Sequence, residues 1–256
     1  MRIAFIGLGA INRAVAAGLR GDPQPATMAA LTRSRASDPD VTALAGVDAL
    51  RDFAPDLVVE AAGHAAARSF GPALLSEGVS VLLASVGALA DPASEDAFRS
   101  APNHGAQLLI PAGALGGLDM VAALPKPTLR EVRYTGTKPP KAWAGSAAAE
   151  GHDLSALMGP VTLFEGSARD AALRFPKNAN VAATLALAGR GFDDTEARLV
   201  ADPHATGNSH AYRVASDTAE MSFAVTAKPS ETPGTSATTA FSLLRAIRNR
   251  SAALVI

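Results

Sequence analysis

Two glycines follow a short apolar run at the start of the chain, an arrangement suited to binding a phosphate group. Residues 3–6 predict a buried strand, and Gly7 and Gly9 come directly after it, before a helical segment over residues 10–19. Gly7 would permit the tight turn, Gly9 would let the backbone approach a pyrophosphate, and the helix would point its free N–H groups at that anion. The third fingerprint position holds Asn12 instead of Gly or Ala, and a plain strand-to-helix turn is the alternative. The predicted dinucleotide contacts in this turn are Gly7, Gly9, Ala10 and Ile11.

The end of the next apolar run bears on which dinucleotide would bind. A carboxylate at this position holds the ribose hydroxyls of NAD, whereas an arginine suits the 2′-phosphate of NADP. This chain has no carboxylate there but has Arg33, Ser34 and Arg35. The two guanidinium groups, with the hydroxyls of Thr32 and Ser34, favour NADP over NAD. A solvated surface loop is the alternative interpretation of the same residues.

Polar and glycine residues also follow the later strands. Gly63 and His64 come after the apolar run at residues 57–61, and Ser85 follows the run at residues 80–84. Ligands of open parallel sheets bind beside the carboxyl ends of the strands. Gly63 and His64 are therefore predicted to lie near the cofactor, and a capping or packing role for His64 is the alternative.

The elements that would position these residues alternate between strand and helix in the first half of the chain. Segments of helical composition, such as residues 10–19 and 65–76, separate the apolar runs, which implies right-handed βαβ units and a parallel sheet of Rossmann type. The apolar runs are residues 3–6, 28–31, 57–61, 80–84 and 107–110.

The pattern changes after Pro111, which indicates a second domain of α/β or α+β type. A helix is predicted over residues 180–188, a loop over residues 228–236 and a closing amphipathic helix over residues 237–248. Residues 211–214 and 220–225 alternate apolar and polar side chains, as half-buried antiparallel strands do. The other predicted strands are residues 131–135, 161–165 and 196–201.

Composition narrows the function classes. The 256 residues carry a formal net charge of −1, which argues against a nucleic-acid partner, and contain no cysteine, which excludes disulfides and thiolate chemistry. No stretch approaches the ~18 apolar residues of a membrane span, and no signal-peptide layout is present. No cluster of histidine and carboxylate residues has metal-ligand spacing, so no metal is expected. These features predict a soluble cytoplasmic protein.

Longer segments resemble the L-aspartate dehydrogenase family over nearly the whole chain. The most specific are Phe-Pro-Lys-Asn-x-Asn-Val-Ala-Ala at residues 175–183 and Asn-Ser-His at residues 208–210, and both occur in the family's order. The glycine turn is shared by many other families. The remaining similar segments are residues 7–11, 85–89, 111–119, 137–140, 164–168 and 201–203.

The resemblance implies a fold, an activity and site residues. The fold would be a Rossmann domain over residues 1–110 and 237–256, with the C-terminal helix returning to it, and a catalytic domain over residues 111–236. Members of the family oxidise L-aspartate to iminosuccinate with NAD or NADP; the imine hydrolyses to oxaloacetate and ammonia, or feeds NAD biosynthesis through quinolinate. The family's catalytic histidine falls on His210, and its cofactor contacts fall on Ala114 and Asn180. Asn12 departs from the family's usual glycine.

This chemistry needs a base and cations. Removing hydride from the substrate Cα requires a neutral amine, and histidine, with an ordinary pKa near ~6.5, is the usual base. His210 is the candidate, although a histidine in a glycine- and asparagine-rich turn is often only a surface residue; His104, His152 and His204 are expected at the surface. Lys138 and Lys177 are predicted to bind the two substrate carboxylates, and Asn178 and Asn180 can offer amide hydrogen bonds to the substrate or to the nicotinamide carboxamide. Ordinary solvated lysines, and an N-cap role for Asn178, are the alternatives.

Two other functions fit the same sequence. One is a related reductase or dehydrogenase that acts on a different amino acid or imine, and the other is a non-catalytic NADP-binding sensor. A sensor would not need His210, and a monocarboxylate substrate would need fewer cations than Lys138 and Lys177 provide. The alternating strands of the second domain could pair across a two-fold axis, so a homodimer is expected.

Overall fold

The chain divides into two compact units, each with its own sheet. The computed structural model describes residues 1–23, 26–32, 38–228 and 237–255. Unit 1 contains Met1–Gly113 and Ala237–Ile256, and unit 2 contains Ala114–Ser236. Among the described residues, no helix is long and apolar enough to cross a membrane.

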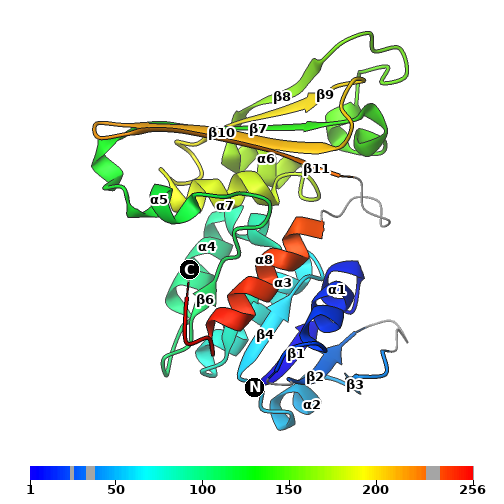
Figure 1. Cartoon of the computed structure of the whole chain (residues 1–256), viewed down its shortest axis with the longest axis vertical. Helices are drawn as coiled ribbons and strands as arrows, with labels where there is room; N and C mark the ends of the chain where they lie inside the picture. Colours follow the sequence, from blue (N-terminus) through cyan, green and yellow to red (C-terminus); the bar gives the residue numbers. More distant parts are fainter. Residues whose placement is uncertain (24–25, 33–37, 229–236, 256) are drawn as a thin grey trace. The chain divides into compact units, whose positions relative to one another are not determined.

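Unit 1 is built on a six-stranded parallel sheet in the order β3-β2-β1-β4-β5-β6 (Figure 1). This is the order of a doubly wound, dinucleotide-binding sheet, with the strand order reversing beside β1 and β4. β1, β4 and β5 are almost entirely apolar because they are buried on both faces. The strands are β1 (Arg2–Ile6), β2 (Thr27–Leu31), β3 (Val41–Leu44), β4 (Leu57–Glu60), β5 (Ser80–Leu83) and β6 (Leu108–Leu109).

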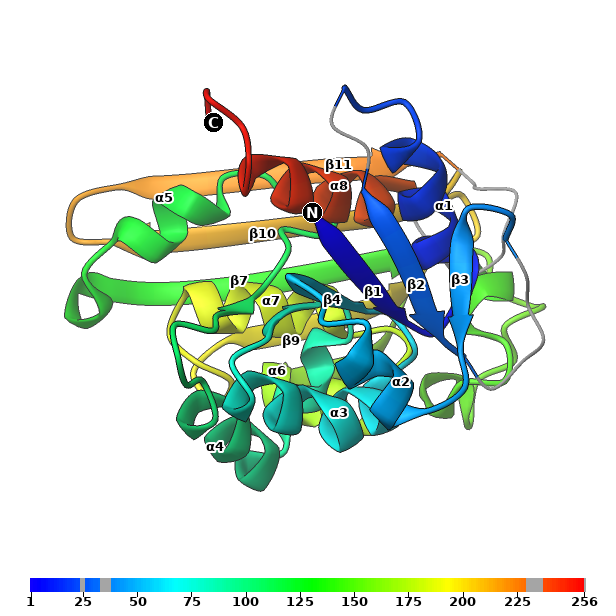
Figure 2. The same ribbon diagram turned by 90° about the horizontal axis from the view of Figure 1, so that it is seen from below.

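Helix α8 (Ala237–Asn249) belongs to unit 1 although it follows unit 2 in the sequence. It packs beside α1 (Ala10–Leu19), as both ribbon views show (Figures 1 and 2). A Cβ built on Gly18 would lie 2.5 Å from a methyl carbon of Leu244, so the glycine allows this close approach. The return of the C-terminal helix is therefore confirmed. The other helices of unit 1 are α2 (Val47–Asp52), α3 (His64–Ser76), α4 (Pro92–Ser100) and the 3-10 helix η1 (Val86–Ala90).

Unit 2 contains a mixed five-stranded sheet in the order β11-β10-β7-β9-β8. β7 and β9 are parallel, and the other neighbouring pairs are antiparallel. The strands are β7 (Leu129–Lys138), β8 (Val161–Ser167), β9 (Glu196–Ala201), β10 (Asn208–Ser216) and β11 (Glu220–Ala227). The helices are α5 (Leu118–Ala123), α6 (Ala168–Arg174), α7 (Asn180–Ala188) and the 3-10 helices η2 (Lys126–Thr128), η3 (Pro140–Trp143) and η4 (Ala147–Ala149).

One face of the unit 2 sheet is buried beneath α6 and α7 (Figure 1). Side chains alternate along a strand, so residues 132, 134, 136 and 138 of β7 point to the same side. All four are buried, whereas Arg133 between them is exposed. Val132, Tyr134 and Gly136 are residue types that commonly occur on a buried face. Lys138, at the end of the strand, is a buried charge, which is costly unless it has a partner.

The predicted fold class is confirmed, with corrections in detail. β3, α2, α4, α5 and α6 were not predicted from the sequence. The loop predicted over residues 228–236 falls outside the described residues, except for Lys228.

Candidate active site

The glycine turn after β1 has the backbone conformation that the fingerprint predicts. Gly7 has φ of +79°, a left-handed value that favours glycine, and a Cβ there would lie 2.8 Å from that of Ala62. A Cβ on Gly9 would meet nothing within 4 Å, and α1 begins at the next residue, Ala10. The turn thus leaves open space in front of a helix N-terminus, and these residues fit a dinucleotide pyrophosphate.

Asn12 fills the third fingerprint position without disturbing the turn. Its side chain is buried, and Nδ2 donates to the carbonyl oxygens of Gly7 (2.7 Å) and Ile6 (3.2 Å). The asparagine therefore ties α1 to the turn through its amide, a connection that a glycine cannot make. Its Oδ1 is buried without a hydrogen-bond partner among the described residues.

A buried carboxylate joins the loops that follow β4 and β5. Oε1 of Glu60 accepts the backbone N–H groups of Ala62 (2.7 Å) and Gly63 (2.9 Å) and the hydroxyl of Ser85 (3.1 Å), and Oε2 accepts the N–H of Ser85 (3.2 Å). Burial raises the pKa of Glu60, against the opposing effect of these hydrogen bonds. The sequence prediction missed this role of Glu60, although a carboxylate ending a buried strand signals that partners are present.

Of the other predicted cofactor residues of unit 1, the structure describes Gly63 and His64. Gly63 has φ of +108° and precedes α3, which begins at the half-buried His64. Both residues follow the carboxyl end of β4, where ligands of such sheets bind. Arg33, Ser34 and Arg35 lie outside the described residues.

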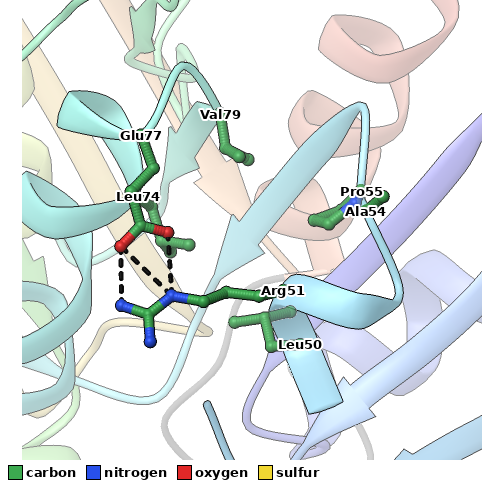
Figure 3. Close-up of a pocket in the computed structure, with 7 residues that line it drawn as sticks. All are labelled: Leu50, Arg51, Ala54, Pro55, Leu74, Glu77 and Val79. Atoms are coloured by element: carbon green, nitrogen blue, oxygen red, sulfur yellow. Dashed lines mark hydrogen bonds and ion pairs between the residues drawn. The ribbon is translucent and has the colours of Figure 1, made fainter. Parts of the chain in front are cut away.

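A cavity of about 280 Å³ lies elsewhere in unit 1 (Figure 3). Val79 in its lining immediately precedes β5 and Pro55 lies two residues before β4, so the cavity lies at the amino ends of these strands. Arg51 and Glu77 form an ion pair in its lining, with Nη2 and Oε1 separated by 2.6 Å. This cavity is at the edge opposite to the glycine turn and is no part of the dinucleotide site.

In unit 2, His210 lies within a strand and is buried. It belongs to β10, pairs with Gly136 of β7 and is 5% exposed, so the interpretation as a surface loop residue is wrong. Its Nδ1 lies 2.7 Å from Oη of the fully buried Tyr134. Tyr134 was not singled out from the sequence.

Lys138 ends β7 on the same buried face and is 8% exposed. Its Nζ donates to Oδ1 of Asn178 (2.7 Å) and lies 5.1 Å from the ring centroid of Trp143. Burial lowers the pKa of Lys138 to about 8. An ordinary solvated lysine is therefore the wrong interpretation, because this ammonium is buried and its position is fixed by Asn178.

The electrostatics of this cluster favour a neutral imidazole. Burial, and secondarily the charge of Lys138, lower the pKa of His210 to about 4. At neutral pH the histidine is therefore unprotonated and can accept a proton, while Lys138 remains mostly charged. A base beside a fixed cation suits a substrate that carries both an amine and a carboxylate.

Of the remaining predicted residues of unit 2, Asn178 joins the cluster of His210 and Lys138 through its contact with Lys138. Asn178 contacts Lys138 and is not the N-cap of α7, which is Ala179, so the capping alternative is wrong. Asn180 is the first residue of α7, and Ala114 is buried at the start of unit 2. Lys177 is exposed; His104, His152 and His204 are exposed as predicted.

A Rossmann unit combined with a second unit that presents a buried base and a buried cation defines a two-domain dehydrogenase. A family model described as "Aspartate dehydrogenase, C-terminal" matches residues 119–250, and one described as "Homoserine dehydrogenase, NAD binding domain" matches residues 7–111. The chain belongs to the aspartate dehydrogenase family. The second match, with the glycine turn, supports a nicotinamide dinucleotide as the cofactor.

Named relatives are similar over the full length of the chain. An L-aspartate dehydrogenase 2 from Bordetella pertussis is 45% identical over 100% of this chain and 98% of its own length. An L-aspartate dehydrogenase from Cupriavidus necator is 40% identical over the full length of both chains. The crystal structure of aspartate dehydrogenase from Thermotoga maritima is 29% identical with a TM-score of 0.80, covering 100% of this chain and 99% of that chain.

Proposed function

We propose that this protein catalyses the nicotinamide-dependent oxidation of L-aspartate to iminosuccinate, which hydrolyses to oxaloacetate and ammonia, and the reverse reductive amination. The observation that carries the proposal is the pairing of a buried, neutral His210 with the buried ammonium of Lys138 on one face of the unit 2 sheet. The names of the full-length relatives support the choice of substrate.

The cofactor would be held by unit 1. Gly7, Gly9, Ala10 and Ile11 would surround the pyrophosphate, with the turn fixed from below by Asn12. Gly63 and His64 are proposed as further cofactor contacts in unit 1, and Ala114 and Asn180, which belong to unit 2, are proposed as contacts on the family resemblance. When bound, the nicotinamide ring supplies the acceptor for the hydride that leaves the substrate Cα.

His210 would accept the proton that the substrate ammonium must lose. Its Nδ1 is occupied by Tyr134, so Nε2 is the nitrogen available to the substrate. Loss of this proton leaves a neutral amine, whose lone pair stabilises the positive charge that develops as hydride leaves the Cα. In the reverse direction the same nitrogen returns the proton.

Lys138 would bind one substrate carboxylate through a charge-assisted hydrogen bond, with Asn178 fixing the ammonium in position. Moving a cation from water into the protein interior is costly, and an anionic ligand bound to Lys138 would offset that cost. Lys177 is proposed to contact the second carboxylate because it directly precedes Asn178 in the chain and its side chain is exposed. Two cations would select a dicarboxylic amino acid over a monocarboxylic one.

The choice of coenzyme, the oligomeric state, the location and the metabolic role are also proposals. We propose NADP over NAD because the charges of Arg33 and Arg35 suit a 2′-phosphate. A homodimer and a cytoplasmic location are proposed from the sequence pattern, and a contribution to NAD biosynthesis is proposed from the family resemblance.

Absorbance of the reduced nicotinamide band tests the reaction. Purified protein would be mixed with L-aspartate and either NADP or NAD, and D-aspartate, L-glutamate and L-homoserine would serve as control substrates. We expect turnover with L-aspartate alone among these, faster with NADP, and its loss in His210→Ala. No turnover with L-aspartate, and none with oxaloacetate plus ammonia in reverse, would eliminate the aspartate assignment.

A further inference from the structure

Tyr134 is a buried polar side chain that takes no part in the proton and hydride transfers described above, although it contacts the proposed base. Its hydroxyl oxygen lies 2.7 Å from Nδ1 of His210, and its ring is fully buried. The two rings are nearly parallel, with centroids 6.1 Å apart and an interplanar angle of 26°. The contact thus restrains both the position and the tilt of the imidazole.

The strand pairing explains why the two groups meet. His210 lies directly opposite Gly136, and Tyr134 and Lys138 are the next residues on the same side of β7. A Cβ at position 136 would lie 2.7 Å from the Tyr134 hydroxyl oxygen, closer than real Cβ atoms approach. Glycine therefore provides the space that lets the phenol reach across to His210.

We propose that Tyr134 is the positioning residue of His210: its hydroxyl binds Nδ1, so that Nε2 is the nitrogen that exchanges a proton with the substrate. This inference rests on the proposed function of His210. Tyr134 itself would not contact the substrate.

A phenol suits this role because it can both donate and accept a hydrogen bond. When His210 carries a proton on both nitrogens, its Nδ1–H donates to the Tyr134 oxygen, and it continues to do so after Nε2 has released its proton. A carboxylate in this position would stabilise the imidazolium and raise the pKa of His210. The neutral phenol orients the ring without opposing the burial and the Lys138 charge that keep the pKa of His210 low.

Steady-state kinetics of Tyr134→Phe test the proposal, with Tyr212→Phe as the matched control. Tyr212 lies two residues from His210 on the same strand face, and its hydroxyl donates to the Gly116 carbonyl oxygen instead of to a titratable group. We expect kcat of Tyr134→Phe to fall roughly tenfold to a hundredfold, because a buried Nδ1–H loses its acceptor, with little change in KM for L-aspartate. Tyr212→Phe should keep kcat near the unsubstituted value. Gly136→Ala should reproduce the loss, because its methyl group would displace the phenol.

Nitrogen NMR of the free protein gives a readout that does not depend on turnover. The imidazole nitrogens of His210 would be identified by ¹⁵N-histidine labelling and by their absence in His210→Asn. Tyr134→Phe should move the Nδ1 resonance and the balance between the two tautomers, and Tyr212→Phe should not. Unchanged His210 resonances in Tyr134→Phe would overturn the proposal, as would an unchanged kcat. If the protein does not oxidise L-aspartate at all, the proposed function fails, and the NMR comparison still decides whether Tyr134 orients His210.

Discussion

Replacing Lys138 by methionine should make the protein more stable and less active at the same time. The lysine is 8% exposed, and within the described part of the chain its ammonium donates one hydrogen bond, to the Asn178 side chain, with the centroid of the Trp143 ring 5.1 Å away. Methionine has a similar length and no charge, so it can fill the same space without the cost of burying a cation.

The magnitude follows from the pKa of Lys138. A pKa that falls from the usual 10.5 to about 8 corresponds to a cost of about 3 kcal/mol for keeping the lysine charged in the folded state. Losing the hydrogen bond to Asn178 costs about 1 kcal/mol. Lys138→Met should therefore raise the free energy of unfolding by about 2 kcal/mol at pH 7.

The gain should depend on pH in a defined direction. Between pH 8 and 10.5 the unfolded lysine still holds its proton while the folded lysine has lost it, so the stability of the unsubstituted protein rises with pH in this window. The advantage of Lys138→Met is thus complete below about pH 8 and fades as pH approaches 10.5.

Urea unfolding at pH 7 and pH 10, with the activity measured in parallel, checks these statements. Lys141→Met is the control, because Lys141 is an exposed lysine three residues away and should change stability by less than about 0.5 kcal/mol. The KM for L-aspartate should rise by roughly tenfold or more in Lys138→Met, because a charge-assisted hydrogen bond to a carboxylate is lost. The reasoning is refuted if Lys138→Met is less stable than the unsubstituted protein at pH 7, or if the difference between them is the same at both pH values.

Three further predictions concern the turn, the sheet edge and the pH profile. Asn12→Ala should weaken dinucleotide binding several-fold, measured by fluorescence titration, and lower stability by about 1 kcal/mol, because the turn loses two hydrogen bonds from the side chain; unchanged binding would contradict this. Glu60→Gln should lower the free energy of unfolding by about 1–3 kcal/mol, since an amide NH₂ must then face the N–H groups that the carboxylate accepted; a thermal melt that shows no loss would refute it. The kcat/KM for L-aspartate should fall as pH rises through about 8, where Lys138 loses its charge, and should show no loss from His210 between pH 7 and 5, because its pKa is about 4; an acid limb near pH 6.5 that disappears in a His210 variant would contradict the second statement.

Most of unit 1 could be predicted because its signals are local. α1 was predicted with its observed bounds, since a glycine turn precedes an alanine-rich amphipathic segment. β3 was missed because Val41 is its only buried residue, as in an edge strand with little apolar pattern. α4 was also missed, although Asp91 and Pro92 form a recognisable start: the Asp91 side chain accepts the N–H of Ser94.

The candidate site of unit 2 depends on strand pairing that local sequence does not contain. His210 was expected in a loop because the preceding turn is rich in glycine and asparagine, and its burial follows only from its pairing with Gly136, 74 positions earlier. The alternation of β7 places Tyr134 on the buried face, but it does not predict that the Tyr134 hydroxyl contacts His210. Lys138 and Asn178 were both selected through the family resemblance, and their mutual hydrogen bond is a finding of the structure.

Deuterium transfer from L-aspartate labelled at Cα tests the central claim most directly. Mass spectrometry of the reduced cofactor would follow the label in the unsubstituted protein and in His210→Ala. The account predicts a reduced nicotinamide that carries one deuterium, formed rapidly by the unsubstituted protein and at a strongly reduced rate by His210→Ala. A reduced cofactor without deuterium, or equal rates in the two proteins, would contradict the assignment of Cα oxidation to this site.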